Sequence, residues 1–590
     1  MTQSNRSMDA NYDPSPGKRN PHKWGYTDTR FEFDGDTTVR LTGDRYPLAG
    51  YALPAFVPFV EEMLGISVRR EDLQEENYDT EIPTANLSEE FITSLLKVMD
   101  SNQVSQDDRD RLIHSHGQLS VDEVYRILYR DALKRVVDLV VYPETDQDVQ
   151  ALIELAGQWD VVLIPYGGGT NVSGALTVPR EERRTVVSVD MRQMDKILWI
   201  DEENGQAHVQ AGISGKALEA ALGAKGYTSG HDPDSVELST LGGWIATNAS
   251  GMKKNRYGNI EDIVIEATLI TPAGIIETHQ VTPRNAIGIQ PRLLLFGNEG
   301  NFGIVTRAVI KIHPLPEVQA YGSLVFPTFE RGVEFLYELR RSGGLPASIR
   351  LVNNNEFRFG RALRGEETLW ASLQGRLQSF VLFQLKGYDP KKMVACTILM
   401  EGNAAEVKQQ RRTIFPLARR FGGLSGGSSG GKRGYMLTFG IAYIRDFFSQ
   451  FQILGETFET SVPWNRIHDV TRSVKEELGK QALEHGIRGR PYLAYRVTQT
   501  YHTGVCIYFT MGFSGVGLQD PDKVYHQVEQ RLRQVILDNG GSLSHHHGVG
   551  KIRQKFLPQI QTEGSTAVLR QVKNAVDPKN IFAVRNGTFD

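Results

Sequence analysis

The sequence predicts a mixed α+β and α/β protein in which two α/β units are flanked by helical N-terminal and C-terminal segments. Three observations lead to this prediction. With 590 residues, the chain is too long for one hydrophobic core, because domains typically contain roughly 100 to 200 residues. From about residue 47 to residue 130, apolar residues recur at three- and four-residue spacing, as on one face of a helix. From residue 138 onward, short strands alternate with helices.

The N-terminal elements are predicted to be a tail followed by a helical region. Residues 1–20 are polar and lack the apolar core of a secretory signal, so we expect a disordered tail. Residues 21–132 form the predicted helical region. Its longest apolar run, residues 46–60, contains three prolines and is shorter than the ~20 residues that span a bilayer, so no transmembrane helix is expected.

The first α/β unit is assigned to residues 133–316. A strand at Asp138–Pro143 leads into a helix that Thr145 can cap, and a second strand follows at Val161–Pro165. A second α/β unit is assigned to residues 317–540. Within it, the glycine-rich stretch 422–433 offers little apolar surface, so a mobile loop or a plain linker is expected there. Residues 541–590 form the C-terminal segment.

The overall composition excludes several classes of function. The chain carries 66 basic and 70 acidic residues, a formal net charge of -4, which provides no global field for attracting nucleic acid or an anionic membrane. Two cysteines, Cys396 and Cys506, cannot build a disulfide framework and are consistent with a reducing compartment.

Three consecutive histidines, His545, His546 and His547, stand in a glycine-flanked stretch near the end of the chain. Imidazole ionises near neutral pH, so such a cluster can take and deliver protons. A simple surface position and a metal site are the alternatives. A zinc site would need further Cys, His or carboxylate ligands at suitable spacing, and the neighbouring sequence offers none, so we predict no metal.

A glycine-rich stretch follows the predicted strand at Val161–Pro165. It reads Tyr166-Gly-Gly-Gly-Thr-Asn171, and bare backbone amides at a strand end can face a pyrophosphate. Such turns are common, and the spacing differs from that of a Rossmann fold, so this motif alone is weak evidence. Three later segments, 232–244, 247–258 and 297–305, add small and polar residues at strand ends.

In this order and spacing, the four segments resemble the FAD-binding domain of the vanillyl-alcohol oxidase flavoprotein family. The resemblance implies a PCMH-type FAD-binding domain at residues 133–316, a substrate-binding cap at 317–540, and noncovalent FAD. It also implies the following cofactor contacts: Pro165, Tyr166, Gly167, Gly168, Gly169, Thr170, Asn171, Asp234, Ser235, Val236, Glu237, Leu238, Ser239, Thr240, Thr247, Asn248, Ala249, Ser250, Glu299, Gly300, Asn301, Phe302, Gly303, Ile304 and Val305.

Within that family, residues 24–582 resemble the alkylglycerone-phosphate synthases, the flavoenzymes that introduce the ether bond of ether lipids. The resemblance rests on several stretches, including 41–48, 251–255, 346–350, 433–446 and 496–501, and on the histidine run. The chain departs from the expected pattern at Asn248, where an Arg is expected, and at Asn301-Phe302, where a Thr-Leu pair is expected.

The resemblance implies that a long-chain fatty alcohol replaces the acyl group of 1-acyl-glycerone 3-phosphate, giving 1-alkyl-glycerone 3-phosphate and a fatty acid. In this family the flavin acts through a covalent N5 adduct without net redox, and proton transfer is required. By match, Tyr508 is an acid/base and the histidines are the proton-handling cluster. Arg445 is implied to hold the substrate phosphate, and Arg350 to support activity.

The resemblance also carries expectations about partners and location. Long aliphatic substrates imply an apolar tunnel and peripheral membrane contact, and the family implies a homodimer. No nucleic-acid partner is expected, because the net charge is close to zero. A eukaryotic enzyme is expected to be peroxisomal, although no targeting signal of that kind is visible, and a bacterial one to be cytoplasmic or membrane-peripheral.

Two alternative functions remain open from the sequence. An FAD-dependent 2-hydroxy-acid dehydrogenase of the D-lactate or glycolate type would share the flavin domain, but it typically reads Glu-His-Gly where this chain reads His546-His547-Gly548. A noncatalytic flavin- or lipid-binding protein would keep the fold but gives no reason for the triple histidine.

Overall fold

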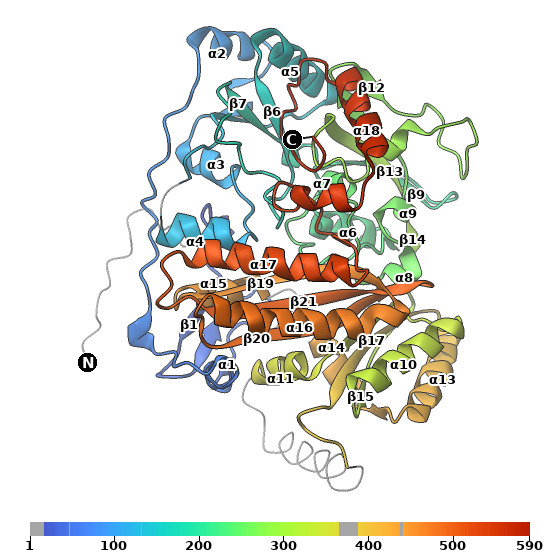
Figure 1. Ribbon diagram of the computed structural model, residues 1–590. Helices are drawn as coiled ribbons and strands as arrows, with labels where there is room; N and C mark the ends of the chain where they lie inside the picture. Colours follow the sequence, from blue (N-terminus) through green and yellow to red (C-terminus); the bar gives the residue numbers. More distant parts are fainter. Residues whose placement is uncertain (1–16, 47, 131–132, 365–386, 437–440, 590) are drawn as a thin grey trace.

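The computed structural model describes residues 17–46, 48–130, 133–364, 387–436 and 441–589 (Figure 1). Most of the predicted tail, residues 1–16, therefore lies outside the described residues. Residues 17–20 differ from the predicted disorder, because Arg19 pairs with Tyr26 in a β-bridge and Asn20 is buried. In the part of the chain that is described, no helix has both the length and the apolar character needed to cross a membrane.

The first domain contains two sheets. In the four-stranded sheet, the order is β4 (Val104–Ser105), β5 (Leu139–Val141), β7 (Val186–Asp190) and β6 (Val162–Tyr166), and β5, β7 and β6 run parallel. Parallel strands need a crossover, which here includes α5 (Asp146–Trp159). As predicted, the Thr145 side chain caps this helix by accepting a hydrogen bond from the Asp148 amide.

The second sheet of this domain is antiparallel. Its order is β12 (Gly274–Ile276), β11 (Val264–Thr271), β13 (Ile304–Lys311), β9 (Gln206–Gln210) and β8 (Ile197–Asp201). Helices α6 (Gly215–Gly223) and α7 (Leu241–Thr247) bury their apolar side chains in the same core as β9 and β13. The two sheets and their helices form the upper half of the molecule in Figure 1.

The cap domain is built on one seven-stranded sheet. Its order is β18 (Leu424–Ser425), β15 (Val318–Phe326), β17 (Val394–Gly402), β16 (Ser348–Val352), β20 (Arg488–Thr500), β21 (Gly504–Ser514) and β19 (Ile453–Pro463). Every pairing between these strands is antiparallel, so the cap has an α+β arrangement rather than the α/β arrangement expected from alternating segments.

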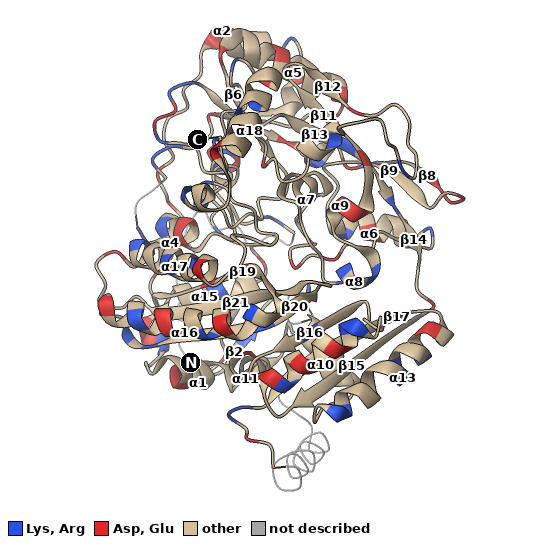
Figure 2. Cartoon of the chain, turned by 45° about the vertical axis from the view of Figure 1, so that its right-hand side comes forward, with Lys and Arg blue, Asp and Glu red and all other residues tan. Residues whose placement is uncertain are grey.

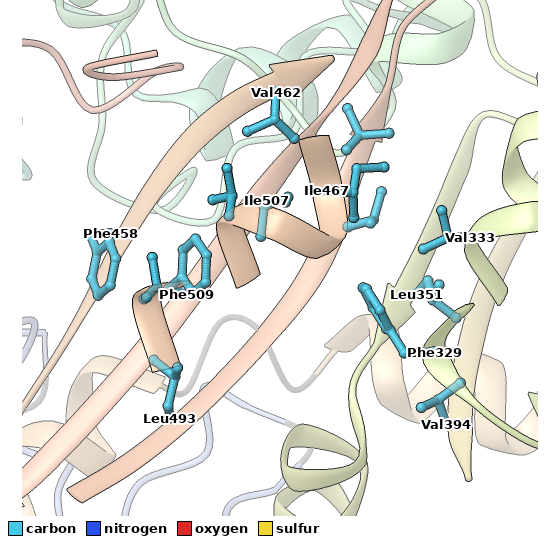
Figure 3. Packing of buried hydrophobic residues seen from close by; sticks show 14 of the residues in the cluster. Phe329, Val333, Leu351, Val394, Phe458, Val462, Ile467, Leu493, Ile507 and Phe509 are labelled. Atoms are coloured by element: carbon cyan, nitrogen blue, oxygen red, sulfur yellow. The ribbon is translucent and has the colours of Figure 1, made fainter. Parts of the chain in front are cut away.

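Helices cover one face of the cap sheet and form the largest hydrophobic core with it. They are α10 (Phe329–Arg341), α13 (Ala404–Arg420), α16 (Ile467–Glu484) and α17 (Pro521–Asp538). Figure 3 shows Ile507 of the sheet beside Ile467 of α16, and Phe458 beside Phe509 of the neighbouring strand. Basic and acidic residues are mixed along α10 and α16, as Figure 2 shows, so neither helix carries charges of one sign alone.

The glycine-rich stretch 422–433 is not the loop that its composition suggests. It contains β18 and the start of α14 (Ser428–Met436). A side chain at Gly431 would place its Cβ 2.2 Å from the Gly322 carbonyl oxygen of β15. The glycines therefore allow α14 to lie directly against the strand backbone, which a local composition cannot indicate.

The N-terminal region is divided between the two domains and is only partly helical. Strands β1 (Phe31–Phe33), β2 (Val39–Leu41) and β3 (Ala52–Leu53) form a small sheet that packs, with α1 (Phe56–Leu64), against α15 (Ile441–Ser449) of the cap. In contrast, α2 (Glu89–Leu95) packs in the core of the first domain. The chain end returns to that core through the buried residues Ile581 and Phe582.

Candidate active site

A cavity of about 400 Å³ lies between the first domain and the open face of the cap sheet. The glycine-rich loop after β6 lines one part of it. Strands β19, β20 and β21 line another. The lining also includes the apolar and aromatic side chains of Phe59, Val60, Met63, Leu64, Phe359, Phe448 and Tyr492, the last of which belongs to β20.

The glycine-rich loop has the form of a phosphate cradle. A Cβ at Gly168 would lie 1.9 Å from the Leu238 carbonyl oxygen, and Gly169 has a φ of +71°. Both positions therefore require glycine. The Asn171 Nδ2 atom is buried without a hydrogen-bond partner among the described residues, although the residue lines the cavity. Bare amides and an unpaired amide donor fit a bound pyrophosphate.

Most of the predicted cofactor contacts line this cavity. They are Pro165, Tyr166, Gly167, Gly168, Gly169, Thr170, Asn171, Asp234, Ser235, Ser239, Thr240, Thr247, Ala249, Ser250, Glu299, Gly300, Gly303, Ile304 and Val305. Six others do not line it: Val236, Glu237, Leu238, Asn248, Asn301 and Phe302.

Four of these six residues support the loops through contacts outside the cavity. Glu237 accepts a hydrogen bond from the Tyr46 hydroxyl at 2.6 Å. Asn248 ends α7 with a φ of +53°, a conformation that asparagine tolerates better than the arginine expected there. Asn301 donates to the Asn586 carbonyl at 3.1 Å, and Phe302 packs on Phe589. The two departures from the family pattern thus lie in the supporting structure.

The three histidines form a turn held by two carboxylates. Glu459 of β19 accepts hydrogen bonds from the backbone amides of His545, His546 and His547, the last at 2.9 Å. Glu299 accepts from the amides that follow, Val549 and Gly550, each at 3.0 Å. The turn is therefore rigid, and it presents His546 and His547 to the cavity.

Hydrogen bonds connect the histidine side chains to one another and to Tyr501. The Nδ1 atoms of His545 and His546 are 2.8 Å apart, and the Tyr501 hydroxyl lies 2.6 Å from Nε2 of His545. Burial lowers the pKa of His545 to about 3 and also lowers the pKa of His546 and His547. At neutral pH the rings are therefore neutral, and each offers one donor and one acceptor for passing protons on.

We expect Glu459→Gln to destabilise the protein by about 1.5 to 3 kcal/mol near neutral pH, because a charged acceptor of several amides is lost. Burial opposes ionisation of Glu459, but the adjacent histidines and Arg533 prevail and hold its pKa well below its ordinary value. The stabilisation from a lowered pKa is complete above the unfolded-state pKa and is lost as the pH falls through the folded-state pKa. Thermal unfolding followed from pH 8 to below pH 4 should therefore show the difference shrinking in acid. An equal difference at every pH would contradict this.

Tyr508 points into the cavity because side chains alternate along β21. Val505, Ile507 and Phe509 face the helix-covered core, so Tyr508 faces the open side of the sheet. Its hydroxyl donates to Oγ1 of Thr457 at 3.0 Å, and its ring stacks on His546 with centroids 5.9 Å apart. Burial raises the pKa of Tyr508, so the phenol keeps its proton in the free enzyme.

The two predicted arginines also line the cavity, but both are already engaged. Arg445 donates to the Leu119 and Gln118 carbonyls at 2.6 and 3.0 Å, and it pairs with Asp446. Arg350 lies on β16, contacts the Met252 sulfur and donates to backbone carbonyls of α14. The structure therefore places Arg350 as a link between the cavity wall and α14.

Comparison with known proteins shows the family. Residues 137–279 match an FAD binding domain, and residues 315–586 match the C-terminal domain of FAD linked oxidases. The chain is 41% identical to an alkyldihydroxyacetonephosphate synthase of Caenorhabditis elegans, over 95% of this chain and 94% of that protein. The chain belongs to the alkyldihydroxyacetonephosphate synthase family.

A solved alkyldihydroxyacetonephosphate synthase has the same fold, with a TM-score of 0.83, 29% identity and coverage of 95% of this chain and 98% of that one. The similarity to a D-lactate dehydrogenase of Archaeoglobus fulgidus is lower, at 24% identity over 75% of this chain and 90% of that protein. The predicted family, fold class and FAD cofactor are thus confirmed.

Several residues around the histidines were not identified from the sequence. Glu459 is one, because nothing local marks a single acid in a strand. Tyr501 and Arg496 lie within the stretch 496–501, on which the family resemblance partly rests, but the resemblance assigned neither residue a role. Arg496 lies 4.2 Å from the centre of the Tyr508 ring and pairs with Glu356 at 2.8 Å. It therefore fixes the ring that Tyr508 presents to the cavity.

Cys506 is another residue near the histidines whose position only the fold reveals. Its sulfur and one nitrogen each of His545 and His546 lie within 4.8 Å of one another. The reason given for predicting no metal, the lack of a further ligand nearby, is therefore wrong. That no metal binds stays a prediction, and burial raises the pKa of the Cys506 thiol, which opposes the thiolate form that metals need.

Proposed function

We propose that this protein is an alkylglycerone-phosphate synthase. It exchanges the acyl group of 1-acyl-glycerone 3-phosphate for a long-chain fatty alcohol and releases a fatty acid, with noncovalent FAD as its cofactor. The observation that carries the proposal is the convergence on one cavity of the glycine cradle, the histidine turn with Tyr508, and an apolar lining. A dehydrogenase acting on a small hydroxy acid would have no use for that apolar lining.

FAD would lie along the glycine cradle and the loops at residues 234–240, 247–250 and 299–305. Bound FAD supplies N5 nucleophilic chemistry without net redox. The aliphatic chains would occupy the apolar part of the cavity, lined by α1 and α15 residues such as Phe59 and Phe448. Burial of these chains away from water is worth about 0.8 kcal/mol per methylene group.

The chain's own residues would handle protons around the reacting carbon. Tyr508 would exchange a proton with the substrates at its hydroxyl oxygen, and His546 stacks on the Tyr508 ring within the cavity wall. His545 links His546 to Tyr501 behind that wall. Arg445 would offer its guanidinium edge to the substrate phosphate, held in place by the two carbonyls that it already contacts.

The test is to incubate the yellow, purified protein with palmitoyl-glycerone phosphate and hexadecanol while following ether product and flavin absorbance. We expect ether formation without net flavin reduction. His546→Ala should lower the rate by about 100-fold or more, because it removes a proton-handling group. Flavin bleaching by 2-hydroxy acids without ether product would make the protein a dehydrogenase, and no reaction with either substrate would favour a noncatalytic binding protein.

Peripheral membrane contact, a homodimer and a peroxisomal location in a eukaryote are further parts of this proposal. The apolar lining supports membrane contact, because long-chain substrates must pass from a bilayer into the cavity. Flotation with phospholipid vesicles and light scattering of the purified protein would test the first two. Retention of the protein in the unbound, monomeric fraction would contradict both.

A further inference from the structure

A reaction of the proposed kind must export a proton from the cavity. The bond between the ester oxygen and the glycerone carbon breaks, and the carboxylate leaves with the electron pair. The alcohol oxygen then forms the new C–O bond and loses its proton. Carboxylic acids ionise near pH 4, so at neutral pH each turnover yields a carboxylate and one net proton. That proton has to leave a site that lies between two domains.

Tyr508 cannot take up this proton as a phenolate that is already present in the free enzyme. Because burial keeps the phenol protonated, its oxygen can accept a substrate proton only if it passes its own hydrogen on at the same time. The acceptor of that hydrogen is Oγ1 of Thr457, at 3.0 Å. The question is therefore where Thr457 passes a proton in turn.

The carboxylate of Glu456 is the next group. Its Oε1 atom accepts from Oγ1 of Thr457 at 3.5 Å and from the Thr457 amide at 2.9 Å. Strand β19 is the last in the order of the described cap sheet, so this amide is free to bind a side chain. Adjacent residues of a strand face opposite sides, so Glu456 starts on the helix-covered face and reaches around the sheet edge to Thr457 and the large cavity.

Behind Glu456 lies a second, small cavity of about 20 Å³, which has room for about one water molecule. Glu456 and Thr457 line it together with α4 (Val121–Tyr129) and α17. Glu456 also lines the large cavity, so it stands between the two. Asp122 of α4 and His526 of α17 line the small cavity. Both residues are partly exposed, so a proton that reaches them can pass to the solvent.

We propose that Glu456 receives the proton of each turnover from Tyr508 through Thr457, and passes it through the small cavity to Asp122 and His526. This assignment rests on the proposed function, because only that reaction requires the export of a proton. The histidine turn would then serve the substrate side of the reaction rather than proton exit.

The electrostatic environment suits this role. Burial, opposed by Arg445, raises the pKa of Glu456 to about 7, so the carboxyl can gain and lose a proton at working pH. Tyr525 also lies near Glu456. The ionisable groups that face Glu456 from the elements around it are Arg445, Asp122, Tyr525, His526, Glu529 and Arg553.

The test compares the pH dependence of kcat for ether formation in matched variants. Glu456 accepts a proton only as a carboxylate, so wild-type kcat should rise with pH through about 7. In Glu456→Gln, kcat should fall about 10-fold or more and lose that rise, with KM and flavin absorbance unchanged. Thr457→Val should have the same effect and Thr457→Ser should not. The double variant Glu456→Gln/Thr457→Val should be no slower than either single one, because both lie on one path.

Failure of the proposed function and failure of the inference about Glu456 give different results. If wild-type protein makes no ether, the proposed function fails and this inference falls with it. If ether forms and Glu456→Gln keeps the rise of kcat near pH 7, the inference alone is wrong. Should Tyr501→Phe remove that rise instead, the proton leaves through the histidine chain. If Glu456→Gln does not fold, the Thr457 pair decides the question, because equal rates for Val and Ser would overturn the proposal.

Discussion

Tyr508→Phe is expected to lower kcat for ether formation by about 100- to 10,000-fold, the range for a lost acid/base group. Phenylalanine keeps the ring, which stacks on His546 and lies under the Arg496 guanidinium. It removes only the hydroxyl that donates to Thr457 at 3.0 Å. The loss should therefore appear in kcat and leave flavin binding and thermal stability nearly unchanged.

Tyr495→Phe is the matched control. Tyr495 lies on the neighbouring strand β20, opposite Phe509 rather than opposite Tyr508, and its ring packs on Phe329 in the helix-covered core. Removing that hydroxyl should leave kcat within about twofold of wild type, since the group is remote from the cavity. If Tyr508→Phe retained most of the activity, Tyr508 would have no proton-transfer role, and the path through Thr457 and Glu456 would lose its first member.

Gly168→Ala is expected to abolish FAD binding and, with it, activity. The new Cβ would lie 1.9 Å from the Leu238 carbonyl oxygen, less than any tolerated contact, so the two cofactor loops would have to move apart. Displacing a backbone carbonyl inside a packed domain typically costs about 1 to 3 kcal/mol. The displacement also moves the backbone amides of the loop away from the positions in which they would face the pyrophosphate. Purified protein should lack the flavin absorbance band, and added FAD should raise its Tm less than it raises that of wild type.

Gly157→Ala provides the control for a glycine in the same domain. Gly157 lies within α5, and a Cβ there would meet nothing within 4 Å. Alanine is favoured over glycine in a helix by up to about 1 kcal/mol, so this variant should bind FAD normally and be slightly more stable. A Gly168→Ala protein that binds FAD as well as Gly157→Ala does would show that the loop after β6 is not the phosphate cradle.

Family, fold class and the FAD cofactor could be predicted from the sequence, because their signals are local. A strand that runs into three glycines is weak evidence by itself, but the order of the four segments along the chain can be recognised without knowing how they pack. The consecutive histidines needed no tertiary information to be noticed. The same local reading was wrong for residues 422–433, where glycines permit close helix packing instead of mobility.

Only the tertiary structure decided which groups surround the histidines and Tyr508. The register of β19 against β21 places Glu459 opposite Tyr508, although 49 residues separate them in sequence, and so brings Thr457 and the histidine turn to the same face. A single Glu or Thr in a strand carries no local signal, because any strand residue of that type has the same neighbours in sequence. Long-range pairing creates the site, so Glu456, Glu459 and Cys506 could be recognised only once the sheet was known.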